Sequence, residues 1–221
     1  MCGRFAFFSS FEVVTAVFGL KNTPALKPRF NVAPGQQVFS VRFENGKLMA
    51  DQFRWGLVPF WAKDPAVGNR MINARAETVA EKPSYRQALR RRRCLIPADG
   101  FYEWQKATHG KQPWFISGSG GALLAFAGLW EEWRDADDTL LRTCTIITTV
   151  ANDFITELHQ RMPVIVSSDQ YETWLDTEAS STDFERVLTA GSEVELQAWP
   201  VSRKVNNPIN DQPELIEAVA G

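Results

Sequence analysis

VFSVRFENGKLMADQFRW (residues 38–55) consists of two runs rich in apolar residues on either side of a turn signal. Valine, phenylalanine and tryptophan favour strands, and Asn45-Gly46 supplies the positive φ angles that a tight two-residue turn requires. The stretch therefore predicts an antiparallel hairpin. A second stretch of this kind, FYEWQKATHGKQPWFIS (101–117), predicts another hairpin that turns at His109-Gly110.

The remaining patterns place this sheet in an α+β fold. Strands are predicted at 122–130, 142–150, 163–167 and 195–201, and helices at 84–92, 152–159, 168–176 and 181–190. A capping box of Ser9 and Glu12 predicts one more helix, which ends at Gly19. Because strands outnumber helices and come mostly as hairpins, we expect a largely antiparallel, barrel-like sheet flanked by short helices. No repeat or linker divides the chain, so we expect one domain over residues 1–221.

Composition restricts the class of protein. The chain has 221 residues, 44% of them hydrophobic and 12% aromatic, which is enough for a sizeable core without disulfide bonds. The three cysteines, Cys2, Cys94 and Cys144, have neither disulfide-framework nor metal-ligand spacing, so no metal or cofactor is predicted. No secretory signal and no apolar run of about 18 residues is present, so we expect a cytoplasmic protein without membrane contact.

The charge distribution gives two readings. A net charge of −2 gives no reason to expect a polyanionic partner. The arginines at 90–93 are nevertheless consecutive, and acidic residues gather at 131–138. The arginine run is either a basic face or the solvated end of a helix with a favourable dipole interaction.

Cys2 is the first residue that could carry chemistry, because it directly follows Met1. Loss of Met1, which the small Cys2 side chain favours, would leave an α-amine and a thiol on adjacent carbons. With ordinary pKa values of about 7.7 to 8.0 and about 8.5, both groups would be partly nucleophilic near neutrality. Such a pair can capture an aldehyde as a Schiff base and then as a thiazolidine. It can equally serve in hydrolysis, and a lone terminal cysteine often has no chemical role.

Two histidines are present. His109 lies at the predicted hairpin tip, where a structural role is favoured. His159, in TELHQRMPVIV, follows a short predicted helix and precedes an apolar strand, where an imidazole could transfer protons at the rim of a cleft.

Other polar candidates lie on strand-like segments. Alternation in FYEWQ places Phe101, Glu103 and Gln105 on one face of a strand, which is either exposed to solvent or part of a cleft that would raise the pKa of Glu103. In INARAET (72–78), Asn73 could hold a carbonyl or an oxyanion, and Arg75 could bind a phosphate.

Aromatic residues cluster in RWGLVPFWAKDP (54–65). Trp55, Phe60 and Trp61 lie around glycine and proline, a composition typical of a loop. Tryptophans most often fill a core, but exposed rings beside arginines would form a stacking platform for unpaired bases.

Taken together, these segments resemble the SRAP family, the SOS response-associated peptidases. The matching blocks are MCGRF, RFNVAPGQ (29–36), WGLVPFW (55–61), INARAET (72–78), RRCLIPADGFYEW (92–104), HQRMPVIV (159–166) and PVSRKVNNP (200–208). They extend from the N-terminus to about residue 210 in the order that the family has them.

The resemblance implies a sensor of abasic sites in single-stranded DNA that acts in the DNA damage response. Covalent capture of one lesion needs only a monomer, so we expect a monomer. Its N-terminal cysteine, after loss of Met1, crosslinks to the aldehyde of the lesion and shields it. By position, the residues with expected roles are Cys2 as nucleophile, Asn73 to orient the amine or substrate, Glu103 and His159 for proton transfer, Arg4 and Arg75 as phosphate contacts, and Phe60 or Trp61 as an aromatic wedge. The family name also implies a peptidase-like activity directed at its own N-terminus, and a lyase activity is a further possibility.

Two other functions stay open at the level of sequence. Cys2, His159 and Asn73 could form the nucleophile, base and orienting group of a cysteine peptidase that acts in trans. Alternatively, the protein could bind modified or single-stranded DNA without a covalent step, through its arginines.

Overall fold

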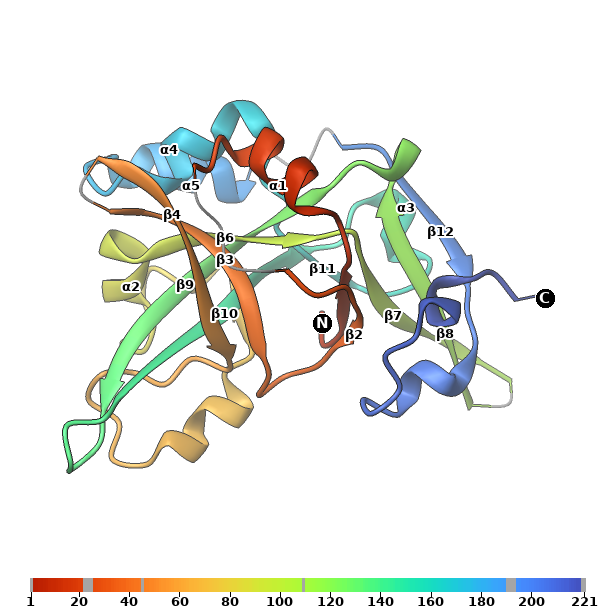
Figure 1. Ribbon diagram of the computed structural model, residues 1–221, viewed down its shortest axis with the longest axis horizontal. Coiled ribbons are helices and arrows are strands. Elements are labelled where there is room, and N and C mark those ends of the chain that lie inside the picture. The colour runs from red at the N-terminus through yellow and green to blue at the C-terminus, as the bar shows by residue number, and fades with distance from the viewer. Residues whose placement is uncertain (1, 22–25, 45, 109, 190–193, 220–221) are drawn as a thin grey trace.

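Five strands close a barrel in the computed structural model, which describes residues 2–21, 26–44, 46–108, 110–189 and 194–219 (Figure 1). The strands are β3 (Gln37–Glu44), β4 (Lys47–Trp55), β6 (Arg93–Ala98), β9 (Leu124–Arg134) and β10 (Leu140–Val150). Four antiparallel pairings join β4 to β3, β3 to β6, β6 to β9 and β9 to β10. Parallel pairing of β10 with β4 closes the ring. The predicted barrel-like sheet and the first hairpin are confirmed.

A second, open sheet packs beside the barrel. Its order is β12 (Leu196–Pro200), β8 (Gly110–Gly118), β7 (Gly100–Ala107), β1 (Phe5–Phe7) and β2 (Arg29–Val32). The β7–β8 pair is the predicted second hairpin, and its pairing extends to Ala107↔Gly110. Asn45 and His109, predicted turn residues of the two hairpins, lie outside the described residues.

The far half of β10 extends beyond the barrel and carries two short strands. β5 (Asn73–Arg75) pairs with it in parallel, and β11 (Arg161–Pro163) pairs antiparallel to it. Thr148 of β10 is the register partner of both Arg75 and Pro163. Segments 73–75 and 161–163, far apart in the chain, are therefore held on opposite sides of one strand.

Short helices cover the outside of this assembly. They are α1 (Phe11–Phe18), α2 (Arg86–Arg91), α3 (Asp153–Thr156), α4 (Tyr171–Leu175) and α5 (Ser181–Thr189), and 3-10 turns include η4 (Arg203–Asn206). Figure 1 shows α1, α4 and α5 together at one end of the molecule. Within the described ranges, no helix combines the length and apolar character that crossing a membrane requires.

Aromatic contacts join the two sheets through β1. The Phe5 ring lies 5.3 Å from the Trp55 ring and 6.1 Å from the Phe126 ring, measured between centroids. Phe101, the register partner of Phe5 on β7, also contacts Phe126 at 5.9 Å. Trp55 is buried, and its indole N–H donates to the carbonyl of Ile72 at 2.8 Å. Trp55 therefore fills the core and does not belong to an exposed stacking platform.

Several predicted boundaries were wrong. The N-cap of α1 is Ser10, whose hydroxyl accepts from the Val13 N–H, because Ser9 instead donates to Asp99 through both its N–H and its hydroxyl. The helix predicted at 152–159 is shorter and is α3. Of the strand predicted at 163–167, only Pro163, the last residue of β11, and an isolated bridge at Ile165 are found. Strands β1, β2, β5 and β6 were not predicted.

The four consecutive arginines do not form one basic face. Arg93 is buried and donates to the carbonyls of Trp174, Leu89, Arg90 and Asp176. Arg92 forms an ion pair with buried Glu131 at 2.8 Å. Arg90 and Arg91 are exposed in the last turn of α2, where positive charge interacts favourably with the helix dipole.

We predict that Arg93→Leu destabilises the protein by about 3 kcal/mol or more, because removing the guanidinium leaves buried carbonyls without donors. The exposed neighbour provides a matched control, so Arg90→Leu should change the free energy of unfolding by less than about 0.5 kcal/mol. Urea denaturation measures both values. Equal effects of the two substitutions would contradict a structural role for Arg93.

Candidate functional site

Cys2 is buried at the start of the chain, just before β1. Its main-chain carbonyl accepts a hydrogen bond from Asn73 Nδ2 at 2.8 Å, and its Sγ lies 4.0 Å from the carbonyl oxygen of Arg4. Asn73 is itself fixed, because it begins β5 and its carbonyl accepts from the Tyr85 hydroxyl at 3.3 Å. The N-terminal end is therefore held against the far half of β10.

Glu103 is brought to the same place by the second sheet. Pairing of β1 with β7 matches Phe5 with Phe101, and the strand alternation places Glu103 on the Phe101 face. Glu103 is only 2% exposed, so the solvent-face alternative is excluded. Burial raises the pKa of the Glu103 carboxyl, and the nearby His159 imidazole opposes this shift.

His159 faces Glu103 across the site. Its Nε2 lies 3.9 Å from Glu103 Oε2, and its Nδ1 lies 3.0 Å from the main-chain nitrogen of Arg161. Nδ1 also lies 3.2 Å from the Arg161 carbonyl oxygen, so both main-chain polar groups of Arg161 contact this ring nitrogen while Nε2 is on the side of Glu103. Gln105, on the Glu103 face of β7, donates to the carbonyl of Glu157 at 3.1 Å and so ties β7 to the segment that carries His159.

The structure corrects the expected reactivity of the thiol. Burial, followed by the negative charge of Glu103, raises the pKa of the Cys2 thiol far above its ordinary value. A thiol in this setting is protonated at neutral pH and needs a neighbouring base to become a nucleophile. The groups that converge here, a buried carboxyl and an imidazole, are of the type that can accept and return such a proton.

We name Cys2, Asn73, Glu103 and His159 the N-terminal site. The four residues come from the chain start, β5, β7 and the segment after α3, and each is linked to another member by a hydrogen bond or by its charge. The described residues contain no group of three or more histidine, cysteine, aspartate or glutamate side chains placed to hold a metal ion. The chemistry that this arrangement supports is proton transfer and attack by sulfur or by a terminal amine.

The predicted DNA contacts differ in their surroundings. Phe60 and Trp61 are 52% and 55% exposed in the loop that follows β4, and Arg75 is exposed at the end of β5. The loop leaves the barrel through Gly56, which has a φ of 128°. A Cβ at this position would lie 2.6 Å from the Gly68 carbonyl oxygen, so a larger residue is excluded. Arg4 is different, because its Nη1 donates within the protein to Asn31 and to the carbonyl of Val205.

Arg161 and Glu77 are residues to which the sequence pattern assigned no role. The Arg161 guanidinium binds both carboxylate oxygens of Glu77, at 2.5 and 3.0 Å, and donates to the carbonyl of Thr148 at 2.6 Å. Because the Arg161 N–H also contacts the His159 ring, this ion pair supports the imidazole. The sequence signal for this contact was that Arg161 lies two residues after His159.

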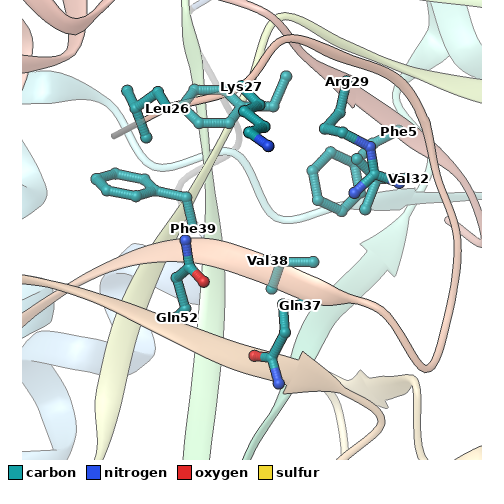
Figure 2. A pocket seen from close by; sticks show the side chains of 10 residues that line it. Phe5, Leu26, Lys27, Arg29, Val32, Gln37, Val38, Phe39 and Gln52 are labelled. Atoms are coloured by element: carbon teal, nitrogen blue, oxygen red, sulfur yellow. The ribbon is translucent and has the colours of Figure 1, made fainter. Parts of the chain in front are cut away.

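A cavity of about 290 Å³ lies apart from the N-terminal site, between β1 and β2 on one side and β3 and β4 on the other. Its lining combines apolar side chains, among them Phe5, Val32 and Phe39, with the basic residues Lys27 and Arg29 (Figure 2). None of the four residues of the N-terminal site lines it.

The fold and the candidate site define an α+β barrel protein with a buried cysteine, a carboxyl and an imidazole gathered near its N-terminal end. Residues 1–208 match the family model described as "SOS response associated peptidase (SRAP)", and the chain belongs to this family. It is 41% identical to "Abasic site processing protein YoaM" of Bacillus subtilis, over 99% of this chain and 98% of that one. It is 31% identical to "Abasic site processing protein YedK" of Escherichia coli, over 99% and 100%.

Solved structures share the fold. A crystal structure of a protein from Bacteroides thetaiotaomicron superimposes with a TM-score of 0.87 at 23% sequence identity, and the match covers 99% of this chain and 100% of that one. At this identity the likeness shows the common fold alone.

We predict that Glu103→Gln stabilises the protein more at high pH than at low pH. Because the pKa of Glu103 is raised in the folded state, wild-type stability falls as pH rises from the unfolded-state pKa through the folded-state pKa. The amide carries no such penalty. The difference in Tm, variant minus wild type, should therefore increase between about pH 4 and about pH 8.

Thermal unfolding across this range checks the sign, with exposed Glu214→Gln as the control for loss of a carboxyl group. A difference in Tm that is constant, or that decreases with pH, would show that Glu103 is not a buried carboxyl of raised pKa.

Proposed function

We propose that this protein processes abasic sites in single-stranded DNA by forming a covalent link through Cys2. The observation that carries the proposal is the convergence of Cys2, Asn73, Glu103 and His159 at the chain's N-terminal end. The relatives named abasic site processing proteins support the choice of substrate. An abasic site in its open form presents an aldehyde, which is the partner that an aminothiol captures.

The chemistry begins with hydrolysis of the Met1–Cys2 peptide bond, which consumes one water and releases methionine. This is the peptidase-like step that the family description suggests. The freed amine then adds to the aldehyde carbon of the lesion, and loss of one water gives a Schiff base. The Cys2 sulfur adds to the same carbon while a proton moves to nitrogen, which closes a thiazolidine ring. The net change from aldehyde and aminothiol is the release of one water.

The neighbouring groups have roles that follow from their positions. Asn73 holds the Cys2 carbonyl and so orients the amine on the adjacent carbon. Glu103 takes the proton from the thiol and supplies the proton that departs with water, tasks for which a raised pKa is suited. His159, beside Glu103, exchanges protons with the sugar and assists in reversal of the link. Reversal regenerates the aldehyde and the aminothiol. Any lyase activity would be a separate step, in which the carbon next to the Schiff-base carbon loses a proton and the 3′-phosphate leaves, so that the strand is cut by β-elimination.

DNA binding in this mechanism uses local contacts rather than the net charge. Arg75 contacts a phosphate, and Phe60 or Trp61 stacks where the base is missing. Because an abasic nucleotide needs no base flipping, covalent capture can follow weak binding. A phosphate contact by Arg4 stays a prediction, because Arg4 Nη1 already donates to Asn31 and to the Val205 carbonyl within the fold. One Cys2 captures one abasic site, so the proposed mechanism requires only a monomer.

We predict that Cys2→Ala abolishes a heat-stable adduct with an oligonucleotide that carries one abasic site. The measurement is a denaturing gel, on which the adduct migrates as a shifted band. The matched control is Cys144→Ala, which removes a buried thiol from β10 and should leave the adduct yield within about twofold.

Equal adduct yield from Cys2→Ala and wild type would exclude the mechanism. Steady turnover of an added peptide by wild type would instead favour a peptidase that acts in trans. Binding that survives the loss of Cys2, with no adduct from wild type, would favour a non-covalent reader.

We predict that Arg75→Gln weakens binding to single-stranded DNA and makes it less dependent on salt. Loss of one phosphate contact should reduce the slope of log affinity against log salt by about 0.7. Fluorescence anisotropy with an oligonucleotide at several salt concentrations gives both quantities. Arg90→Gln, an exposed arginine on α2, is the control, and an equal effect there would remove the case for a specific contact at Arg75.

A further inference from the structure

We propose that residues 203–211 form a C-terminal clamp that positions Cys2 through Arg4, and that Asn31 and Asp211 are positioning residues for the N-terminal site. The inference rests on the proposed function for its consequence in catalysis. Its structural basis is independent of that function, because it lies in the contacts between this segment, β2 and the residue two places after Cys2.

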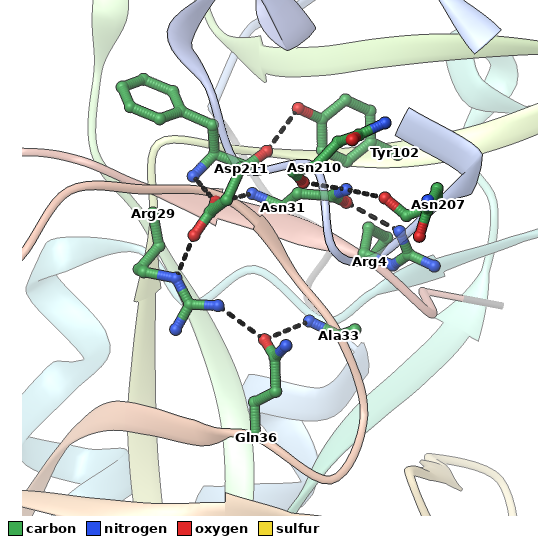
Figure 3. A network of polar contacts seen from close by, with 10 residues as sticks. Arg4, Arg29, Asn31, Ala33, Gln36, Tyr102, Asn207, Asn210 and Asp211 are labelled. Carbon is green, nitrogen blue, oxygen red and sulfur yellow. Dashed lines mark hydrogen bonds and ion pairs between the residues drawn. The ribbon is translucent and has the colours of Figure 1, made fainter. Parts of the chain in front are cut away.

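Asn31 joins the clamp to the N-terminal segment. The side chain is fully buried, and its Nδ2 lies within hydrogen-bond distance of the carbonyls of Val205, Asn207 and Asn210, at 3.2, 3.1 and 2.7 Å. Its Oδ1 accepts from Arg4 Nη1 at 2.7 Å. Both polar atoms of this buried amide are therefore engaged, and they connect segments near the two ends of the chain (Figure 3).

Asp211 fixes the other end of the clamp. Its Oδ1 accepts from the main-chain N–H groups of Phe30 and Asn31, at 2.6 and 2.8 Å, and its Oδ2 accepts from Arg29. Phe30 is held again through its carbonyl, which accepts from the Tyr102 hydroxyl at 2.7 Å. Figure 3 shows these contacts as one network that runs from Arg29 to Arg4. The clamp is thus bonded to β2, the edge strand next to β1.

Arg4 is held at both its side chain and its main chain. Nη1 donates to Asn31 and, at 2.8 Å, to the carbonyl of Val205 in the clamp. The guanidinium carbon lies 5.9 Å from the Trp104 ring centroid, and the Trp104 indole donates to Asn206 Oδ1 at 2.8 Å. The Arg4 carbonyl accepts from the Tyr102 N–H at 3.0 Å and lies 4.0 Å from Cys2 Sγ.

A chain terminus frays unless it is tied down, and a reaction at the first residue depends on its orientation. Asn73 holds the Cys2 carbonyl from one side, and Arg4, fixed by the clamp, holds the next part of the chain over β7 and Glu103. Removing the clamp should therefore leave the reacting groups intact but poorly placed. In this proposal Arg4 orients the chain next to Cys2, which is an alternative to the phosphate contact predicted from the sequence.

The first test is Asp211→Ala, with exposed Glu214→Ala as the control for loss of a carboxylate three residues beyond the clamp. With saturating abasic oligonucleotide, the crosslinking rate of Asp211→Ala should fall about tenfold or more, since displacement by about 1 Å can cost about a hundredfold. DNA affinity and its salt slope should stay at the wild-type values. Asp211→Asn, which keeps the Oδ1 acceptor, should restore most of the rate.

A second measurement needs no DNA. Cys2 is buried in the wild type, so iodoacetamide should alkylate it faster in Asp211→Ala than in wild type or Glu214→Ala, as measured by mass spectrometry of the N-terminal peptide. If wild type forms no crosslink, the proposed function fails while this measurement still tests the clamp. Unchanged alkylation together with an unchanged crosslinking rate in folded Asp211→Ala would overturn the clamp.

Arg4→Lys distinguishes positioning from phosphate binding and keeps the test valid if Asp211→Ala does not fold. Lysine keeps the positive charge but lacks the planar guanidinium that reaches Asn31 and Val205 together. A positioning role predicts a lower crosslinking rate at saturating DNA with unchanged affinity and salt slope. A wild-type rate at saturating DNA, or a loss confined to affinity, would overturn the proposal.

Discussion

The antiparallel pairing of β1 with β7 is the constraint on which the rest of the site depends. It places Phe5 opposite Phe101, and through the hydrogen bond between Tyr102 and Arg4 it brings the first residues of the chain beside Glu103. The Phe5 and Phe101 rings both contact Phe126 on the barrel, so the register is also locked by packing. A slip of one residue would move Glu103 to the opposite face of the strand.

The candidate site gathers two groups whose ionisation is costly in the folded protein. A carboxyl with a raised pKa and a buried thiol both cost folding free energy when they ionise, because burial disfavours the charged form of each group. The residues that carry these groups are held by the pairing of β1 with β7 and by the far half of β10, which pairs with β5 and β11. Such a cost at a functional site is consistent with a scaffold that must hold reacting groups at fixed positions.

Much of this arrangement could be predicted from the sequence because some signals are local. The hairpin at 38–55 follows from alternation and a turn, and Cys2, Asn73, Glu103 and His159 stood out by residue type and position. Alternation gave the face of Glu103, but it could not tell whether solvent or protein covers that face. The burial of Glu103 in the folded protein answers this question. That burial depends on the pairing of β1, a strand of three residues whose partners are about 25 and 95 positions away in the chain.

The roles of other residues could not be predicted for a related reason. Asn31 lies in the block RFNVAPGQ, but the block assigns it no role, and its hydrogen-bond partners are carbonyls about 175 residues later in the chain. Arg4 was expected to contact a phosphate, and the sequence could not show that its Nη1 donates to Asn31 and to the Val205 carbonyl within the fold. The raised pKa of the Cys2 thiol likewise reflects burial, whereas the sequence supplies only the ordinary value.

Mass spectrometry of the purified protein–DNA adduct tests covalent capture by the N-terminal cysteine most directly. We expect an adduct mass equal to the protein without Met1 plus the abasic oligonucleotide minus one water, with the modification on the N-terminal cysteine after proteolysis. An adduct that retains Met1, or one whose modification maps to a lysine or to Cys94 or Cys144, would contradict this chemistry.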